Sequence, residues 1–149
     1  MPSTAAHARL DVDYVITDSP ANLLQRTDTL AVFGFGNNAP RHEDPRYLRV
    51  PLQPHGAAPF EVWRTHGPVT HGRDGDIAWA TDGQLLFGAI EIDEREIGIE
   101  AAANAAYAQL TAFLGRSATP QLLRIWNYLD AITLGDGDAE RYRQFCVGR

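Results

Sequence analysis

The sequence predicts an α+β fold in which one long helix packs on a mixed β-sheet. Segments with the alternation or apolar clustering of strands are spread through the first 92 residues, and an alanine-rich segment with helical spacing follows at 99–114. Strands first and a long helix later are typical of this class. At 149 residues, with 44% hydrophobic and 21% charged residues, the chain has the size and composition of one folded domain, expected over residues 1–149.

Four strands are predicted in the first half of the chain. Their apolar residues alternate or cluster between turn-forming residues, at 10–16, 29–35, 47–52 and 60–64. Pro51, Pro54 and Pro59 separate the last two segments. Because proline cannot donate to the ladder inside a sheet, we expect edge strands and an irregular connection there.

The second half is predicted to contain a hairpin, the long helix, a strand and a short helix. Residues 76–80 and 84–92 flank a turn in which Gly83 follows Asp82 and supplies the positive φ of a tight hairpin. Small alanine side chains let the helix at 99–114 approach a sheet closely, and Gly115 is expected to cap it. A strand at 121–129 and a short helix at 139–147 complete the prediction.

Charge and composition exclude several classes of function. All 13 basic residues are arginine, and 19 acidic residues give a net charge of -6 without any basic run. Nucleic acid and anionic membranes are therefore not expected as partners, since both need clustered cations. A single cysteine, Cys146, and the lack of an apolar run of membrane-spanning length favour the cytoplasm. His66 and His71 have no third ligand at a typical spacing, so no metal is expected. Pro40 follows the glycines at 34 and 36 where a phosphate-binding helix would begin, so no nucleotide or other cofactor is expected either.

Arginine and aromatic residues concentrate near the end of the chain. In a strand at 121–129, Arg124, Trp126 and Tyr128 would share one face. The planar fork of arginine matches a carboxylate, and a tyrosine hydroxyl adds a donor, so the cluster suits a small, doubly anionic substrate. Alternatively, Arg124 and Arg141 pair with nearby acidic residues while the two aromatic side chains fill the core. For Tyr142 and Arg149, the residue types alone do not decide between a binding role and a structural role.

The same segments carry a family resemblance. RIWNY at 124–128 and ERYRQFCVGR at 140–149, with VFGFG at 32–36, VPLQ at 50–53 and GAIE at 88–91, resemble the N-terminal part of the chorismatase family. Within it, the similarity is greatest to bacterial bifunctional 3-/4-hydroxybenzoate synthases. It extends over nearly all of the 149 residues.

The resemblance implies a fold, an activity and two site residues. Members of the family are more than twice as long and have two domains related to the RidA/YjgF fold. Chorismate is expected mainly on the C-terminal half, which supplies a glutamate as general acid or base and is absent here. A tyrosine and an arginine of the last segment hold substrate carboxylate, which assigns that role to Tyr142 and Arg149. No catalytic residue is expected in this chain, since nothing marks Glu91 or Glu94 as desolvated.

Two functions follow as hypotheses. The first is the N-terminal part of a chorismate-converting enzyme that releases pyruvate and forms 3-/4-hydroxybenzoate, with the 149-residue chain inactive alone. The alternative is a stand-alone RidA-like module that binds a small carboxylate or a partner without catalysis. Structural ion pairing at an oligomer interface is a third reading, and exposed sheet edges would favour a homo-oligomer.

Overall fold

The computed structural model describes residues 9–17, 19–56 and 60–149, and these residues form two compact units. The first unit comprises Met1–Gly72 and Ala80–Phe87, and the second comprises Arg73–Trp79 and Gly88–Arg149. Strands and helices are both present, which confirms the α+β class. Among the described residues, no helix combines the length and apolar character needed to cross a bilayer.

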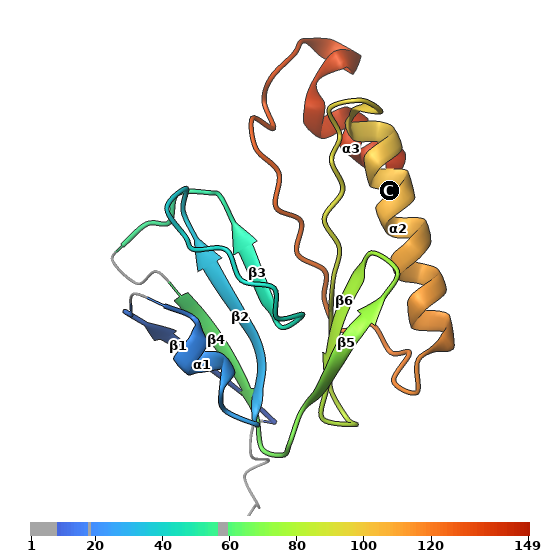
Figure 1. Ribbon diagram of the computed structural model, residues 1–149. Helices are drawn as coiled ribbons and strands as arrows, with labels where there is room; N and C mark the ends of the chain where they lie inside the picture. Colours follow the sequence, from blue (N-terminus) through green and yellow to red (C-terminus); the bar gives the residue numbers. More distant parts are fainter. Residues whose placement is uncertain (1–8, 18, 57–59) are drawn as a thin grey trace, which may run out of the picture. The chain divides into compact units, whose positions relative to one another are not determined.

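The first unit is built on a four-stranded mixed sheet, as predicted (Figure 1). In spatial order its strands are β1 (Leu10–Val15), β4 (Phe60–Thr65), β2 (Thr29–Phe35) and β3 (Tyr47–Val50). β2 and β3 are parallel, whereas β1 and β2 both pair antiparallel with β4. The expected edge position is confirmed for β3 but wrong for β4. Proline precedes β4 in the sequence without interrupting it, so the amides of this strand remain available to both neighbours.

β2 is the central strand of the core and is buried on both faces, which accounts for its continuous apolar composition. On one face, Val32 packs with Val62 and with Leu23 and Leu24 of the short helix α1 (Ala21–Leu24). The alternate residues of β2 belong to a second cluster, where the ring of Phe33 lies 4.9 Å from that of Trp63. α1 was not predicted, because four residues are too few to show helical periodicity.

Arg46 is a buried arginine that ties α1 to the sheet of the first unit. Only 6% of the residue is exposed, and its guanidinium forms an ion pair with Asp44 at 2.7 Å. It also donates to the carbonyl oxygens of Leu24, Arg26 and Thr29, between the end of α1 and the start of β2. Burial alone would raise the pKa of Asp44, but the hydrogen bonds from Arg46 outweigh it and hold that pKa below its ordinary value.

A second sheet has the strand order β5 (Thr70–Asp74), β6 (Ile77–Thr81) and β7 (Leu86–Ala89), and the boundary between the units passes through it. The predicted hairpin turn joins β6 and β7. Gly83 has a φ of +91°, and the carboxylate of Asp82 accepts hydrogen bonds from the amides of Gln84 and Leu85 at 2.9 and 2.8 Å. β7 is shorter than the predicted segment 84–92.

The predicted long helix is confirmed as α2 (Gly98–Arg116). Phe113 of α2 lies near β7, since a Cβ built on Gly88 would lie 3.7 Å from its ring. The predicted cap at Gly115 is wrong. α2 continues through Gly115, and the extended backbone of Ser117, with ψ of 148°, ends the helix without a left-handed residue.

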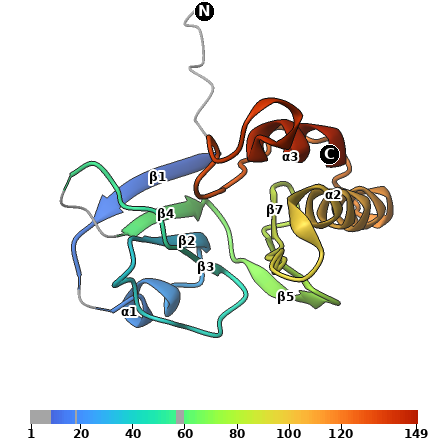
Figure 2. The same ribbon diagram turned by 90° about the horizontal axis from the view of Figure 1, so that it is seen from above.

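The short helix predicted at 139–147 is confirmed as α3 (Arg141–Gly148), which follows one 3-10 turn at Gly137–Ala139. α3 lies beside the first part of α2 (Figure 2). The shared cluster contains Ile99 and Ala103 of α2 and Phe145 of α3, each no more than 6% exposed. These two helices form the core of the second unit.

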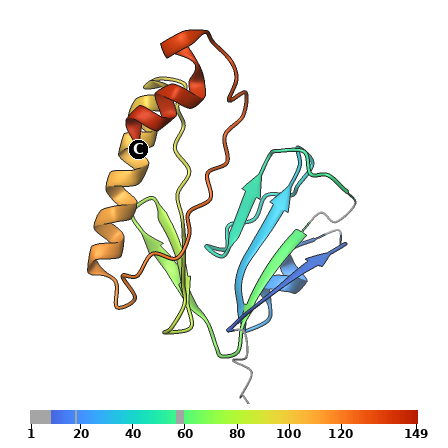
Figure 3. The ribbon, with the colours of Figure 1, turned by 180° about the vertical axis from the view of Figure 1, so that it is seen from behind.

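The strand predicted at 121–129 is not formed. These residues belong to neither sheet and make an extended connection between α2 and α3 (Figures 1 and 3). Alternation in a sequence specifies which side chains share a face, whereas a strand also needs a neighbour for its peptide groups. Within the described part of the chain, neither sheet provides that neighbour.

The predicted alternation of faces nevertheless appears in this extended segment. The side chain of Asn127 accepts a hydrogen bond from Tyr107 of α2 at 3.2 Å, and Leu129 packs on the cluster between α2 and α3. Arg124 belongs to the other row, and its guanidinium lies 4.9 Å from the ring centroid of Trp126. Asn127 and Leu129 of one row therefore contact the second unit, and the other row contains Arg124 and Trp126.

Candidate functional site

Tyr142 and Arg149, the two predicted site residues, lie two turns apart at the start and the end of α3. Both contact the same side chain, Phe145. The ring of Tyr142 stacks on it with centroids 6.4 Å apart, and the guanidinium of Arg149 lies 5.9 Å from its centroid. Residues three and four apart share a helix face, so Phe145 forms a common support for the two polar groups.

Phe145 fixes the face of α3 that carries Tyr142 and Arg149, because its side chain is buried between α2 and α3. It is 5% exposed, packs with Ile99 and Ala103, and meets the ring of Tyr107 edge-on at 6.3 Å. Tyr142, by contrast, is 48% exposed. The buried ring of Phe145 therefore supports the exposed phenol of Tyr142 and the exposed guanidinium of Arg149.

Gly148 sets how closely the end of α3 approaches α2. A Cβ at this position would lie 2.1 Å from the carbonyl oxygen of Glu100 and 3.0 Å from Cβ of Ala103. Only glycine fits there without displacing backbone. The sequence analysis did not identify Phe145 or Gly148 as part of the site. The spacing of Phe145, three residues after Tyr142 and four before Arg149, could have indicated it. No local signal in the sequence marks Gly148.

We expect Gly148→Ala to lower the free energy of unfolding by about 1–3 kcal/mol, because the added methyl group overpacks the contact between α2 and α3. Urea denaturation followed by circular dichroism would measure the loss. Gly115→Ala is the matched control, since a Cβ at Gly115 meets nothing within 4 Å. Equal stability of the two variants would contradict the inferred close approach.

The other two arginines of α3 are paired with neighbouring carboxylates. Arg141 pairs with Glu94 at 2.6 Å and with Asp130 at 3.2 Å. Arg143 lies within 3.5 Å of an oxygen of Asp138 and within 3.4 Å of one of Glu140. The structural alternative considered from sequence is therefore correct for Arg141. It is wrong for the aromatic residues of 121–129, which do not fill the core, since Trp126 and Tyr128 are 46% and 38% exposed.

Arg149 differs from these arginines. Within residues 9–17, 19–56 and 60–149, it forms no ion pair with an acidic side chain, and it is exposed. An exposed guanidinium and a half-exposed phenol on one helix face can each donate hydrogen bonds to carboxylate oxygens. This arrangement can bind an anion. A proton donor for catalysis would have to come from another group.

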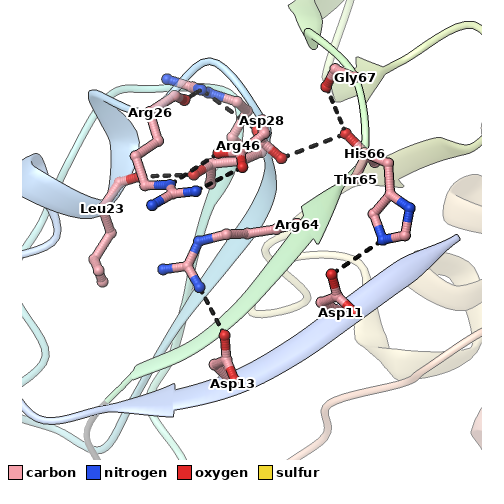
Figure 4. A network of polar contacts seen from close by, with 11 residues as sticks. Asp11, Asp13, Leu23, Arg26, Asp28, Arg46, Arg64, Thr65, His66 and Gly67 are labelled. Atoms are coloured by element: carbon pink, nitrogen blue, oxygen red, sulfur yellow. Dashed lines mark hydrogen bonds and ion pairs between the residues drawn. The ribbon is translucent and has the colours of Figure 1, made fainter. Parts of the chain in front are cut away.

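A second polar cluster lines a groove in the first unit, at the ends of β1 and β4 (Figure 4). Its polar side chains form internal pairs: Arg64 with Asp13 at 2.7 Å, Arg26 with Asp28 at 2.7 Å, and His66 with Asp11 at 3.1 Å. The sequence did not indicate this cluster, whose members lie far apart along the chain. Because three carboxylates face only two guanidinium groups and one histidine, the groove shows no preference for an anion comparable to that of Arg149.

Comparison with known proteins identifies the class of protein to which this structure belongs. The family described as "Chorismatase FkbO/Hyg5-like, N-terminal" matches residues 61–149, which is more than half of the chain. The matched range includes the helices α2 and α3 and both predicted site residues. The chain belongs to this family of chorismatases.

Individual relatives agree with this assignment. A chorismatase of Streptomyces hygroscopicus is 42% identical over 92 residues, and one of Streptomyces rapamycinicus is 38% identical over 91 residues. Each match covers 60% of this chain but only 26% and 27% of the respective relative. A crystal structure of a chorismatase superimposes with a TM-score of 0.74 at 28% identity, covering 93% of this chain and 43% of that chain. The chain thus spans less than half the length of these proteins.

Proposed function

We propose that the chain is the N-terminal part of a cytoplasmic enzyme that converts chorismate to 3-/4-hydroxybenzoate and pyruvate. Its own contribution is to hold substrate carboxylate with Tyr142 and Arg149, while a C-terminal part supplies the catalytic acid. The observation that carries the proposal is the exposed Arg149 guanidinium, which lacks an acidic partner among the described side chains and shares the Phe145 support with Tyr142. In the same proposal, the arrangement of sheets and helices is a RidA/YjgF-like domain.

The chemistry of chorismate suits this division of work. The substrate has a ring carboxylate and an enolpyruvyl carboxylate, and release of pyruvate requires protonation of the methylene carbon of the enol ether together with cleavage of an ether C–O bond. Holding both anions still is a positioning task that can lower the barrier by several kcal/mol, whereas protonation needs an acid with a raised pKa. Glu94 does not fit that second role, because it is already paired with Arg141 at 2.6 Å.

The first experiment asks whether the reading frame continues beyond Arg149 into a C-terminal part, and compares that longer polypeptide with the 149-residue chain. Both are supplied with chorismate, and pyruvate and hydroxybenzoate are assayed. We expect turnover by the longer polypeptide only. Turnover by the 149-residue chain would show that it contains the acid, and binding of small carboxylates without turnover by either protein would favour a stand-alone binding module.

A further inference from the structure

The extended segment 121–129, called the docking segment below, exposes a run of large apolar side chains. The exposed fractions are Leu122 55%, Leu123 83%, Ile125 37%, Trp126 46% and Tyr128 38%. Large exposed apolar patches on soluble proteins mark sites of interaction with a partner. Arg124 is the only charged residue of the segment, so its surface suits an apolar partner better than a charged polymer.

The backbone of the docking segment is suited to strand addition. It is extended but belongs to neither sheet, and the peptide groups of such a segment can pair with an incoming strand. The segment is also held in place, because the side chain of Asn127 is hydrogen-bonded to Tyr107 and Leu129 packs on the apolar cluster between α2 and α3. A partner strand would therefore meet a template that is already partly ordered.

The lengths of the relatives indicate which partner covers this surface. The match to the solved chorismatase covers 93% of this chain but only 43% of that protein, so 57% (100 − 43) of that chorismatase lies outside the match. The family description further places the matched region at the N-terminal side. A C-terminal part joined to the same chain would be present at high effective concentration next to the segment.

We propose that the docking segment binds the C-terminal part of the longer polypeptide, which adds a β-strand beside it and covers Leu122, Leu123 and Ile125. The inference rests on the proposed function in one respect, because both require that a C-terminal part exists. It concerns the assembly of the two parts, so it can fail or hold independently of chorismate conversion.

Hydrogen exchange in the absence of chorismate tests this assembly. The amides of 121–129 are compared in the 149-residue chain and in the longer polypeptide, with the amides of α2 as the internal reference. We expect exchange in the docking segment to be at least about tenfold slower in the longer polypeptide. Leu123→Asp in the longer polypeptide should abolish most of that protection. Ile97→Asp is the control, because Ile97 is 52% exposed but lies outside the segment.

Several results would overturn the inference. Equal exchange in both proteins would mean that the segment is already covered within the chain or is never covered, and a reading frame that ends at Arg149 would remove the partner. Dimers of the 149-residue chain that Leu123→Asp dissociates, without protection in the longer polypeptide, would assign the surface to a second copy. Protection without turnover would count against the proposed function alone, whereas turnover without protection would count against the docking alone.

Discussion

Replacing Arg46 with methionine is expected to lower the free energy of unfolding by about 3–5 kcal/mol, the largest loss that we anticipate for a single substitution in this chain. Methionine preserves much of the buried aliphatic stem but removes the guanidinium. Asp44, whose side chain is 14% exposed, would then lose its ion pair at 2.7 Å. The carbonyl oxygens of Leu24, Arg26 and Thr29 would lose a donor as well.

Arg26→Met is the matched control for this prediction. Arg26 also pairs with an aspartate two residues away, Asp28 at 2.7 Å, but its side chain is 57% exposed. Exposed ion pairs contribute only about 0–1 kcal/mol, so this variant should resemble the unmodified chain in urea denaturation. If Arg46→Met proved no less stable than Arg26→Met, the buried network would not hold α1 on the sheet.

Arg149→Ala in the longer polypeptide is expected to reduce kcat/KM for chorismate by about tenfold to a hundredfold. The substitution removes a charge-assisted hydrogen bond to carboxylate, of a kind that contributes roughly 1.5–3 kcal/mol. The side chain is exposed at the end of α3, so the loss should appear in kinetics rather than in folding. Steady-state measurement of pyruvate release provides the values.

Arg143→Ala serves as the comparison for Arg149→Ala. Arg143 lies on the same helix but is paired with Asp138 and Glu140, and its side chain is 59% exposed. We expect kcat/KM of Arg143→Ala to change by less than about twofold, because exposed ion pairs of this type contribute little free energy. A similar kcat/KM for the two variants would assign Arg149 a structural role and leave the carboxylate to other residues.

The strands and helices with strong local signals could be predicted from sequence. The long helix follows from helical periodicity, the strand 29–35 from a continuous apolar run, and the hairpin turn from the conformational freedom of Gly83. The segment 121–129 shows the limit of this reasoning. Its alternation is real, but forming a strand depends on a neighbour that neither sheet of the described chain provides.

Features that depend on residues far apart in the sequence could not be predicted in this way. Arg46 looks like any surface arginine until α1 and β2 enclose it, and Gly148 looks like an ordinary glycine until its contact with Glu100 is known. Arg141 and Arg149 are similarly indistinguishable by residue type. The structure separates them, because only Arg141 meets Glu94 and Asp130.

By itself, the sequence determined the α+β class, the positions of most strands and helices, and the family, because these follow from local periodicity and from motifs that can be recognised in order along the chain. Tertiary structure alone decided which arginines are neutralised, that Phe145 supports both Tyr142 and Arg149, and that residues 121–129 stay outside the sheets. Ion pairing, close packing and strand pairing all depend on distances between residues that the order of amino acids does not specify.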